Sequence, residues 1–533
     1  MNKNLLLSLF VFVLPSIVSA QFLQKITTAG GVSIDHAHLI NDIVSVKEHG
    51  FLVVNSIAWK DSSEVELQIF DLTRTLTNRQ NLKIPVTSGD VQIQGYREWH
   101  NTFLLFISVY QESIRKNELY AYQYSLPDLR LIKKQKLEDV FNPPNNRLPF
   151  FYAASPDEQR LVVSSWSYTL PDDSGKINSI VFNDQFEKID ELQYLIPYKN
   201  KNLFIRENLI DNSGNVYIIG KNHNANPLLG YRQLAEVNGV KFVLAFLKKQ
   251  KEPELFEIDV KKHRFDQILF KVNEDEELIG VGLFKKGSKL FYSGTGLFLL
   301  DPEDKTIKMT TQEIEKEDFH AALGEVQPDF NISRDYFQKA RIKDVITKRN
   351  AYYVIGERIH VTTASQFSDN RIRYNNNFLN NRRINNNDRI TKEQTLLDMF
   401  VIKLDTRGKF MWMKRIPKMQ SLDEKFSKYL SFNVIERERD LLLFYNDHQD
   451  NFDYENKDKL KLANVRSSVP MLAKVSYSSG KIVKRKLTSL FGKNALIRPH
   501  FCKMLDEERV FMFGQKKKHN LETYRMKIAR LGN

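Results

Sequence analysis

The stretch Asp398-Met-Phe-Val-Ile-Lys-Leu-Asp405, Thr406-Arg-Gly-Lys409, Phe410-Met-Trp-Met-Lys-Arg-Ile416 decides the fold class. Two runs rich in apolar and aromatic residues flank a short polar turn with a glycine, a pattern typical of a β-hairpin. The same order returns in Met471–Tyr477 and Ile482–Leu487, which a polar turn separates. This recurrence indicates antiparallel β-structure built from repeats.

Eight short apolar runs, most of them preceded by a turn signal, mark the repeats along the chain. They are Phe51–Val54, Phe103–Ile107, Leu161–Val163, Val216–Ile219, Leu290–Tyr292, Tyr352–Ile355, Leu441–Tyr445 and Val510–Phe513. Consecutive apolar residues predict strands buried on both faces, and helical segments that could cover them are scarce, so sheets must cover sheets. Repeats of roughly 40 to 65 residues with this character are typical of propeller blades. We therefore predict an all-β fold, a β-propeller of about seven or eight antiparallel blades that forms a single domain over residues 21–533.

Composition limits the partners. The 533 residues include one cysteine, Cys502, so no intrachain disulfide can form. The formal net charge is +14 and the basic residues are spread along the chain, which suits an anionic partner and leaves nucleic acid unexpected. Most basic pairs lie beside turns or at strand ends, where a solvated face is the simpler interpretation.

The first twenty residues predict a signal peptide. Lys3 supplies a positive start, Leu5–Leu14 an apolar stretch and Val18-Ser19-Ala20 a small-residue cleavage site, so the mature chain should begin at Gln21. The apolar stretch is shorter than the roughly 20 residues of a spanning helix, although an uncleaved anchor is the alternative. We expect an exported protein, periplasmic, extracellular or associated with the cell envelope, without a membrane span in the mature chain.

The two ends of the mature chain look complementary. Residues Val510–Arg530 form an incomplete unit, and Phe22–Thr27 reads as a strand without a neighbour. We predict that they complete one blade together and close a monomeric ring, because closure removes exposed strand edges.

Three segments interrupt the repeat. Thr310 and Glu313 form a capping box that predicts a short helix over Gln312–Leu323. Residues 358–393 are rich in Asn and Arg and predict a loosely ordered loop, with an anion-binding arm carrying Arg382 and Arg383 as the alternative. Residues 447–468 form a third polar loop insertion.

Motifs for catalysis are absent from the sequence. There is no nucleophile elbow, phosphate-binding loop, dinucleotide fingerprint or zinc-protease helix, so no cofactor is predicted and no catalytic residue can be named. His36 and His38, two apart on a presumed strand, are weak candidate metal ligands. Asn446, Asp447 and His448, at the end of an inner strand, are candidate binding residues, with a simple turn as the alternative.

One segment suggests a resemblance. Asp398–Lys418, continuing through Met419-Gln420-Ser421 to Tyr445–His448, resembles an uncharacterised family of exported bacterial β-propeller proteins. The likeness covers about Tyr352–Leu487. It implies a secreted or envelope propeller and supplies no activity or site residues.

Two classes of function remain open, and the sequence leaves it uncertain whether the protein is an enzyme. The first is a propeller scaffold that binds a protein or an anionic glycan at the cell envelope. The second is a polysaccharide hydrolase or lyase whose site is assembled from several blades. A converging cluster of Asp, Glu, His or Arg in the central pocket would favour the enzyme, and a large apolar or basic rim would favour binding.

Overall fold

The computed structural model describes most of the chain. The described residues are 24–27, 33–36, 39–46, 50–59, 62–73, 75–84, 90–126, 128–141, 150–169, 174–199, 203–223, 240–248, 253–258, 263–286, 292–301, 306–314, 340–348, 350–361, 394–421, 429–456, 460–464, 466–491, 495–505, 509–518 and 521–530. The predicted signal peptide, residues 1–20, lies outside them. Within them, no helix is long and apolar enough to cross a membrane.

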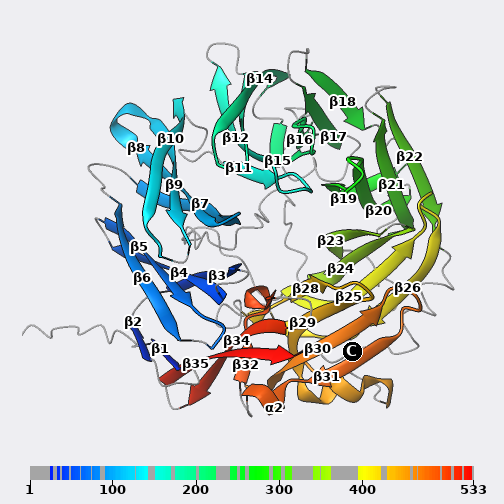
Figure 1. The fold of residues 1–533 in the computed structure, drawn as a ribbon. Helices are drawn as coiled ribbons and strands as arrows, with labels where there is room; N and C mark the ends of the chain where they lie inside the picture. Colours follow the sequence, from blue (N-terminus) through cyan, green and yellow to red (C-terminus); the bar gives the residue numbers. More distant parts are fainter. Residues whose placement is uncertain are drawn as a thin grey trace, which may run out of the picture.

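Eight sheets stand around a common axis as the blades of a β-propeller (Figure 1). Blade 1 consists of β3 (Leu39–Val46), β4 (Gly50–Trp59), β5 (Ser62–Phe70) and β6 (Leu76–Ile84). Blade 2 consists of β7 (Asp90–Trp99), β8 (Thr102–Gln111), β9 (Lys116–Ser125) and β10 (Leu131–Phe141), with η2 (Glu112–Ile114) between β8 and β9. Blade 3 consists of β11 (Phe151–Ala154), β12 (Leu161–Thr169), β13 (Ser174–Phe182) and β14 (Lys188–Lys199).

The next blades repeat this order. Blade 4 consists of β15 (Leu203–Ile210), β16 (Val216–His223), β17 (Val240–Leu247) and β18 (Glu254–Ile258). Blade 5 consists of β19 (His263–Val272), β20 (Leu278–Lys286), β21 (Gly294–Asp301) and β22 (Thr306–Glu313). Blade 6 consists of β23 (Ala340–Lys348), β24 (Ala351–Val361), β25 (Gln394–Leu404), β26 (Phe410–Ile416) and the short β27 (Gln420–Ser421). Blade 7 consists of β28 (Phe432–Glu436), β29 (Asp440–His448), β30 (Ser468–Ser476) and β31 (Ile482–Lys486), with η8 (Gln449–Asn456) after β29 and α2 (Thr488–Phe491) after β31.

Blade 8 joins the two ends of the chain. It contains β32 (Ala495–Ile497), η9 (Pro499–Phe501), β33 (Lys503–Met504), β34 (Arg509–Lys518) and β35 (Leu521–Arg530). Strand β1 (Gln24–Thr27) pairs in parallel with β35, and β2 (Ser33–His36) follows β1. The prediction that the termini complete one blade is therefore confirmed, and β35 is no longer an open edge.

In blades 1 to 7 the first strand is innermost. Neighbouring inner strands contact each other, as β11 contacts β15 and β19 contacts β23, while the last strands lie on the outside of the ring (Figure 1). The predicted all-β propeller is confirmed, and its number of blades is eight.

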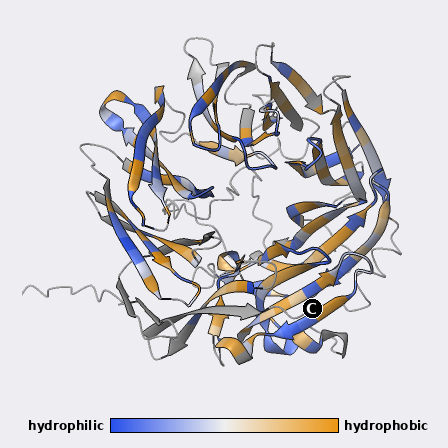
Figure 2. Ribbon diagram, viewed as in Figure 1, coloured by the Kyte–Doolittle hydropathy of each residue, from blue (hydrophilic) through white to orange (hydrophobic). Residues whose placement is uncertain are grey.

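Alternate residues of one strand pack against two different blades. In β29, Leu441, Leu443 and Tyr445 pack against blade 6, whereas Leu442 and Phe444 pack against blade 8. Successive side chains of a strand point to opposite faces, so consecutive apolar residues are what a blade between two blades requires. Figure 2 shows this as hydrophobic strand segments repeated around the ring.

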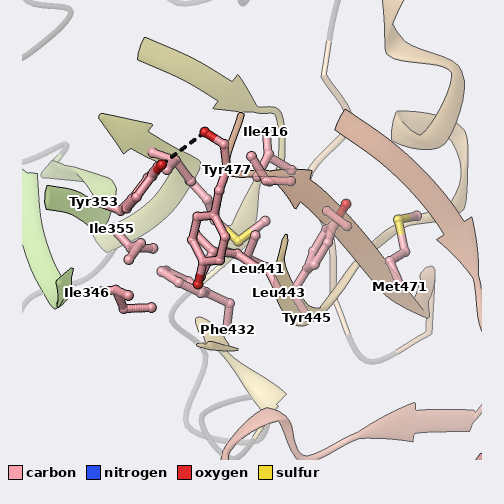
Figure 3. Packing of buried hydrophobic residues seen from close by; sticks show 14 of the residues in the cluster. Ile346, Tyr353, Ile355, Ile416, Phe432, Leu441, Leu443, Tyr445, Met471 and Tyr477 are labelled. Atoms are coloured by element: carbon pink, nitrogen blue, oxygen red, sulfur yellow. Dashed lines mark hydrogen bonds between the residues drawn. The ribbon is translucent and has the colours of Figure 1, made fainter. Parts of the chain in front are cut away.

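The contact between blades 6 and 7 illustrates the packing (Figure 3). There the Tyr353 hydroxyl donates a hydrogen bond of 2.9 Å to the carbonyl oxygen of Tyr477. Phe432, Leu441 and Leu443 are fully buried in the same cluster. Each such apolar side chain stabilises the ring by about 1.5–3 kcal/mol relative to exposure.

Two predictions of local structure need correction. Thr310–Glu313 belongs to β22 and pairs with β21, so the capping box is wrong; residues 315–323 of the predicted helix lie outside the described residues. β-branched threonines in this segment favour an outer strand as readily as a helix start. Of the run Leu290–Tyr292, predicted as a strand, only Tyr292 is among the described residues, and it lies outside the strands. Tyr292 precedes β21.

The two polar insertions are shorter than predicted. Arg358 belongs to β24, which continues to Val361, so the first insertion begins after this residue. Asp447 and His448 complete β29, and Ser468 begins β30. Buried hydrogen bonds and ion pairs hold polar residues in these strand ends, a possibility that polar composition alone conceals.

Candidate functional site

The two ends of the ring carry different connections. We call the end at which the innermost strands begin the loop face; they begin at Leu39, Asp90, Phe151, Leu203, His263, Ala340, Phe432 and Ala495. The opposite end, the turn face, carries tight turns closed by backbone hydrogen bonds, such as Asp211 to Asn215 at 3.1 Å and Asp405 to Lys409 at 2.9 Å. Gly214 and Gly408 supply the positive φ that these turns need.

The long connections all begin and end on the loop face. They cover residues 224–239, 315–339, 362–393 and 449–467. Binding residues concentrate on loops that a rigid scaffold carries, so the loop face is the candidate functional face.

The innermost strands are interrupted near the loop face. Register shifts that mark a β-bulge or irregularity fall between Ile40 and Asp42, Ile93 and Gly95, Ile205 and Glu207, Phe265 and Ile268, and Ile342 and Asp344. In blade 8 the inner strand is instead split at η9, where Pro499 lacks a backbone donor. Bulges bend a strand and redirect side chains, and they are common beside functional sites.

Side chains at these interruptions bond the next blade. Gln267 Nε2 donates to the carbonyl oxygen of Ile342 at 3.0 Å, and Ile342 N donates to Gln267 Oε1 at 3.1 Å. Lys343 Nζ donates to the carbonyl oxygen of Phe432. These bonds satisfy backbone groups that the inner edge of a sheet would leave unpaired.

A buried group of charged residues lies between blades 6 and 7 at the loop face. Lys418 Nζ lies 3.0 Å from Glu357 Oε2, and Arg341 pairs with Glu357 Oε1. Ser431 Oγ donates to Glu357 Oε1 at 2.8 Å and accepts from Arg341 Nη2 at 3.0 Å. We call Arg341, Glu357, Lys418 and Ser431 the Glu357 cluster.

Charge in this region is unbalanced toward the positive. Burial by itself raises the pKa of Glu357, but Arg341 and Lys418 lower it to about 2 overall. Lys343, beside the cluster, has a pKa lowered to about 7, because burial and then the charge of Arg341 disfavour its protonated form. The Glu357 carboxylate therefore faces three cationic side chains, Arg341, Lys418 and Lys343.

A second buried ion group, Arg358, Asp398 and Arg415, lies further out in blade 6. Arg415 Nε lies 2.8 Å from Asp398 Oδ2, and Arg358 pairs with the same oxygen. Burial by itself raises the pKa of Asp398, but the two arginines lower it, and the net effect is a lowered pKa. Asp398 and its two cations are almost wholly buried, which makes this group structural.

The predicted binding residue Asn446 has a structural role. Its Nδ2 donates to the carbonyl oxygens of Tyr429 at 2.9 Å and Ile497 at 2.8 Å, and its Oδ1 accepts from Ile497 N at 3.0 Å. Gln420 links Asn446 to the Glu357 cluster, because its Nε2 donates to the Asn446 carbonyl oxygen at 2.6 Å. Asn446 thus joins blades 7 and 8 and has no exposed surface.

Only one carboxylate oxygen of Asp447 has hydrogen-bond partners. Its Oδ1 accepts from Met419 N at 3.2 Å and from Asn451 Nδ2 at 3.0 Å, whereas Oδ2 is buried without a hydrogen-bond partner. Burial raises its pKa to about 7. His448 is half-buried and its Nδ1 accepts from Asp450 N at 3.2 Å. These residues form a paired strand end rather than a turn.

The structure does not test the other predicted candidates. His36 ends β2, while His38, Arg382 and Arg383 lie outside the described part of the chain. No group of three or more His, Cys, Asp or Glu side chains placed to hold a metal occurs where the structure is described.

Sequence reasoning missed Arg341, Lys343, Lys418, Ser431 and His500. A signal for the inner strands does exist: Ile40-Asn-Asp42, Ile205-Arg-Glu207 and Ile342-Lys-Asp344 share an isoleucine, a polar residue and an acid, and each spans a bulge. That pattern would have located Lys343.

The chain is only distantly similar to proteins of known structure. No protein-family model and no curated protein matches the chain. Among solved structures, the Pyrococcus horikoshii acylaminoacyl peptidase has a TM-score of 0.36 and 11% identity, over 90% of this chain and 58% of the peptidase. The β-propeller domain of the Trilobed protease from Pyrococcus furiosus has a TM-score of 0.36 and 9% identity, over 84% of this chain and 97% of the domain. The Synechocystis apocarotenoid oxygenase mutant Glu150Asp has a TM-score of 0.36 and 10% identity, over 88% of this chain and 95% of the oxygenase. At these values none of their properties carries over.

Proposed function

We propose that this protein is a propeller scaffold that binds an anionic partner, an acidic glycan, through its loop face. The observation that carries the proposal is the unequal charge at the inner end of blades 6 to 8. There Arg341, Lys343 and Lys418 all act on the carboxylate of Glu357. The overall charge of +14 attracts polyanions over longer distances.

The alternative, a polysaccharide hydrolase or lyase, has less support. Such hydrolases use two carboxyl groups about 5–10 Å apart, one of them with a raised pKa. Glu357 and Asp398 are bound by cations, and their pKa values are lowered. Three described carboxyls with a raised pKa, Glu207, Asp344 and Asp447, belong to blades 4, 6 and 7, and Asp447 has no exposed surface.

We place the scaffold outside the cytoplasm, at the cell envelope, as the first twenty residues suggest. N-terminal mass spectrometry of the mature protein should find Gln21 first. Retention of Leu5–Leu14 would favour the uncleaved anchor instead.

Binding to an immobilised acidic polysaccharide, such as polygalacturonate or dextran sulfate, tests the function. Arg115 and Arg466 are exposed on the loop face, whereas Arg407 and Lys409 are exposed on the turn face. The double variant Arg115→Gln/Arg466→Gln should bind about fivefold more weakly, because each exposed charge contributes about 0.5 kcal/mol. Retention should also fall as salt rises.

The matched control is Arg407→Gln/Lys409→Gln, which removes the same charge from the turn face. This control should bind like the unaltered protein. Equal loss in both double variants would reduce the binding to nonspecific charge attraction and overturn the loop-face proposal. Release of reducing sugars or unsaturated products from either polymer would instead support the enzyme.

A further inference from the structure

Three interruptions of the inner strands meet at one place on the loop face. Lys343 occupies the bulge of β23 in blade 6, and Ser431 directly precedes β28 of blade 7. His500 lies in η9, where the inner strand of blade 8 is split. Strand β28 and η9 contact each other, so these three segments are neighbours.

The side chains there present donors around a small region. Lys343 Nζ lies 3.3 Å from Ser431 Oγ, and Arg341 Nη2 lies 3.0 Å from the same oxygen. Ser431 is buried with φ of 62°, in the left-handed region that a serine rarely adopts. Such strain occurs where the surrounding structure enforces a conformation, often at binding sites.

Positive charge surrounds His500. Its pKa is lowered to about 3 by burial and then by Lys343, Lys503, Arg498 and Arg341. The imidazole is therefore neutral at pH 6 and at pH 8, and a neutral ring still donates one hydrogen bond. Lys343, Arg341 and His500 each keep part of their surface exposed.

We propose that Arg341, Lys343 and His500, the Lys343 site, bind one oxyanion group such as the sulfate or carboxylate of an acidic glycan. Every charged group that lowers the pKa of His500 is a cation, and partly buried cations that face one another favour a bound anion. Arginine and lysine beside a neutral imidazole supply the donors that an oxyanion requires. The inference rests on the proposed function in taking the partner to be anionic.

Binding at this site should depend on pH through Lys343. The charged and titratable groups facing Lys343 are Arg341, Asp344, Glu357 and Lys418, with His500 from blade 8. With a pKa of about 7, the protonated fraction of Lys343 falls from about 0.9 at pH 6 to about 0.1 at pH 8. Only the protonated amine attracts the anion, so affinity should fall about tenfold between these pH values.

Isothermal titration of the full chain with sodium sulfate, and separately with sodium glucuronate, tests the proposal. Lys343→Gln keeps an amide donor for Phe432 but removes the charge, and should weaken binding at pH 6 about tenfold or more. Lys271→Gln is the matched control, because Lys271 Nζ likewise donates to a carbonyl oxygen of the next blade, that of Val345, at 3.2 Å. This control should bind as the unaltered protein does. Tighter binding of sulfate than glucuronate would identify a sulfate ester, and the reverse a uronate.

A second measurement needs no change at Lys343. Asp447 also has a pKa of about 7, but it faces Lys418, so Asp447→Asn should keep the tenfold pH dependence. Absence of binding by both anions, unaltered binding in Lys343→Gln, or affinity independent of pH in the unaltered chain would each overturn the proposal. If the protein binds the acidic polymer but Lys343→Gln does not change the binding of small anions, the scaffold function stands and only this site is refuted.

Discussion

Replacement of Glu357 by Gln is the most informative perturbation of the ring. The carboxylate is fully buried between Arg341 and Lys418, and the substitution leaves both cations without their counter-ion. Breaking a buried ion pair on one side costs about 3–5 kcal/mol. Glu357→Gln should lower the free energy of unfolding at pH 7 by that amount.

The pKa of Glu357 gives a second estimate of its contribution to the free energy of unfolding. A carboxyl whose pKa falls from 4.5 to about 2 on folding adds about 3 kcal/mol to the stability above pH 4.5. The folded-state pKa is depressed, so this contribution is lost as pH falls from 4.5 through about 2. The unaltered protein should lose it over that range, whereas Glu357→Gln has no such carboxyl to protonate and should show a flatter acid branch.

Urea denaturation at pH 7 and at pH 3, followed by tryptophan fluorescence, measures both effects. Glu276→Gln is the control, since Glu276 is exposed and bonds Ser213 Oγ at 2.7 Å; its cost should stay below about 1 kcal/mol. The reasoning is refuted if Glu357→Gln has the same free energy of unfolding at pH 7 as the unaltered protein. It is also refuted if both proteins lose the same stability between pH 7 and pH 3.

Three further perturbations test the ring. Gln267→Ala removes both bonds between Gln267 and Ile342 and should cost about 1–3 kcal/mol in urea denaturation, whereas no loss would mean that these bonds do not join blades 5 and 6. Replacement of residues 362–393 by Gly-Asn should leave the melting temperature within a few degrees, because Val361 pairs with Gln394 and a two-residue turn can join them; an unfolded product would make the segment structural. Deletion of residues 22–27 should lower the melting temperature and promote self-association, because β1 covers β35 in blade 8; a monomer of unchanged stability would contradict closure by β1.

The fold could be predicted because its signal is local and repeated. Runs such as Leu441–Tyr445 are apolar on consecutive positions, and the structure uses these alternately for two neighbouring blades. Strand pairing by the N-terminal residues was also predictable, because the last unit lacks an outer strand. The predicted helix start was wrong because Thr310 and Glu313 suit both a capping box and an outer strand, and only pairing with β21 decides between them.

The candidate site could be predicted only in part. The sequence indicated Asn446 and Asp447 at a strand end, and in the structure Asn446 bonds blade 8 and Asp447 bonds blade 6. The cluster residues Arg341, Lys418 and Ser431 come from three separate segments of the chain. No spacing between them in the sequence predicts that they lie together. Long-range contacts of this kind depend on how the blades are arranged around the axis, which composition and periodicity do not encode.

The central claim is that an anionic partner binds the loop face at the inner end of blades 6 to 8. Amide hydrogen exchange with and without an acidic polysaccharide tests it most directly. We predict slower exchange in residues 340–346, 429–434 and 495–503, which surround the Lys343 site, and unchanged exchange in the turn-face segments 211–215 and 405–409. Protection confined to the turn-face segments, or none in the three loop-face segments under conditions where the polymer binds, would contradict the account.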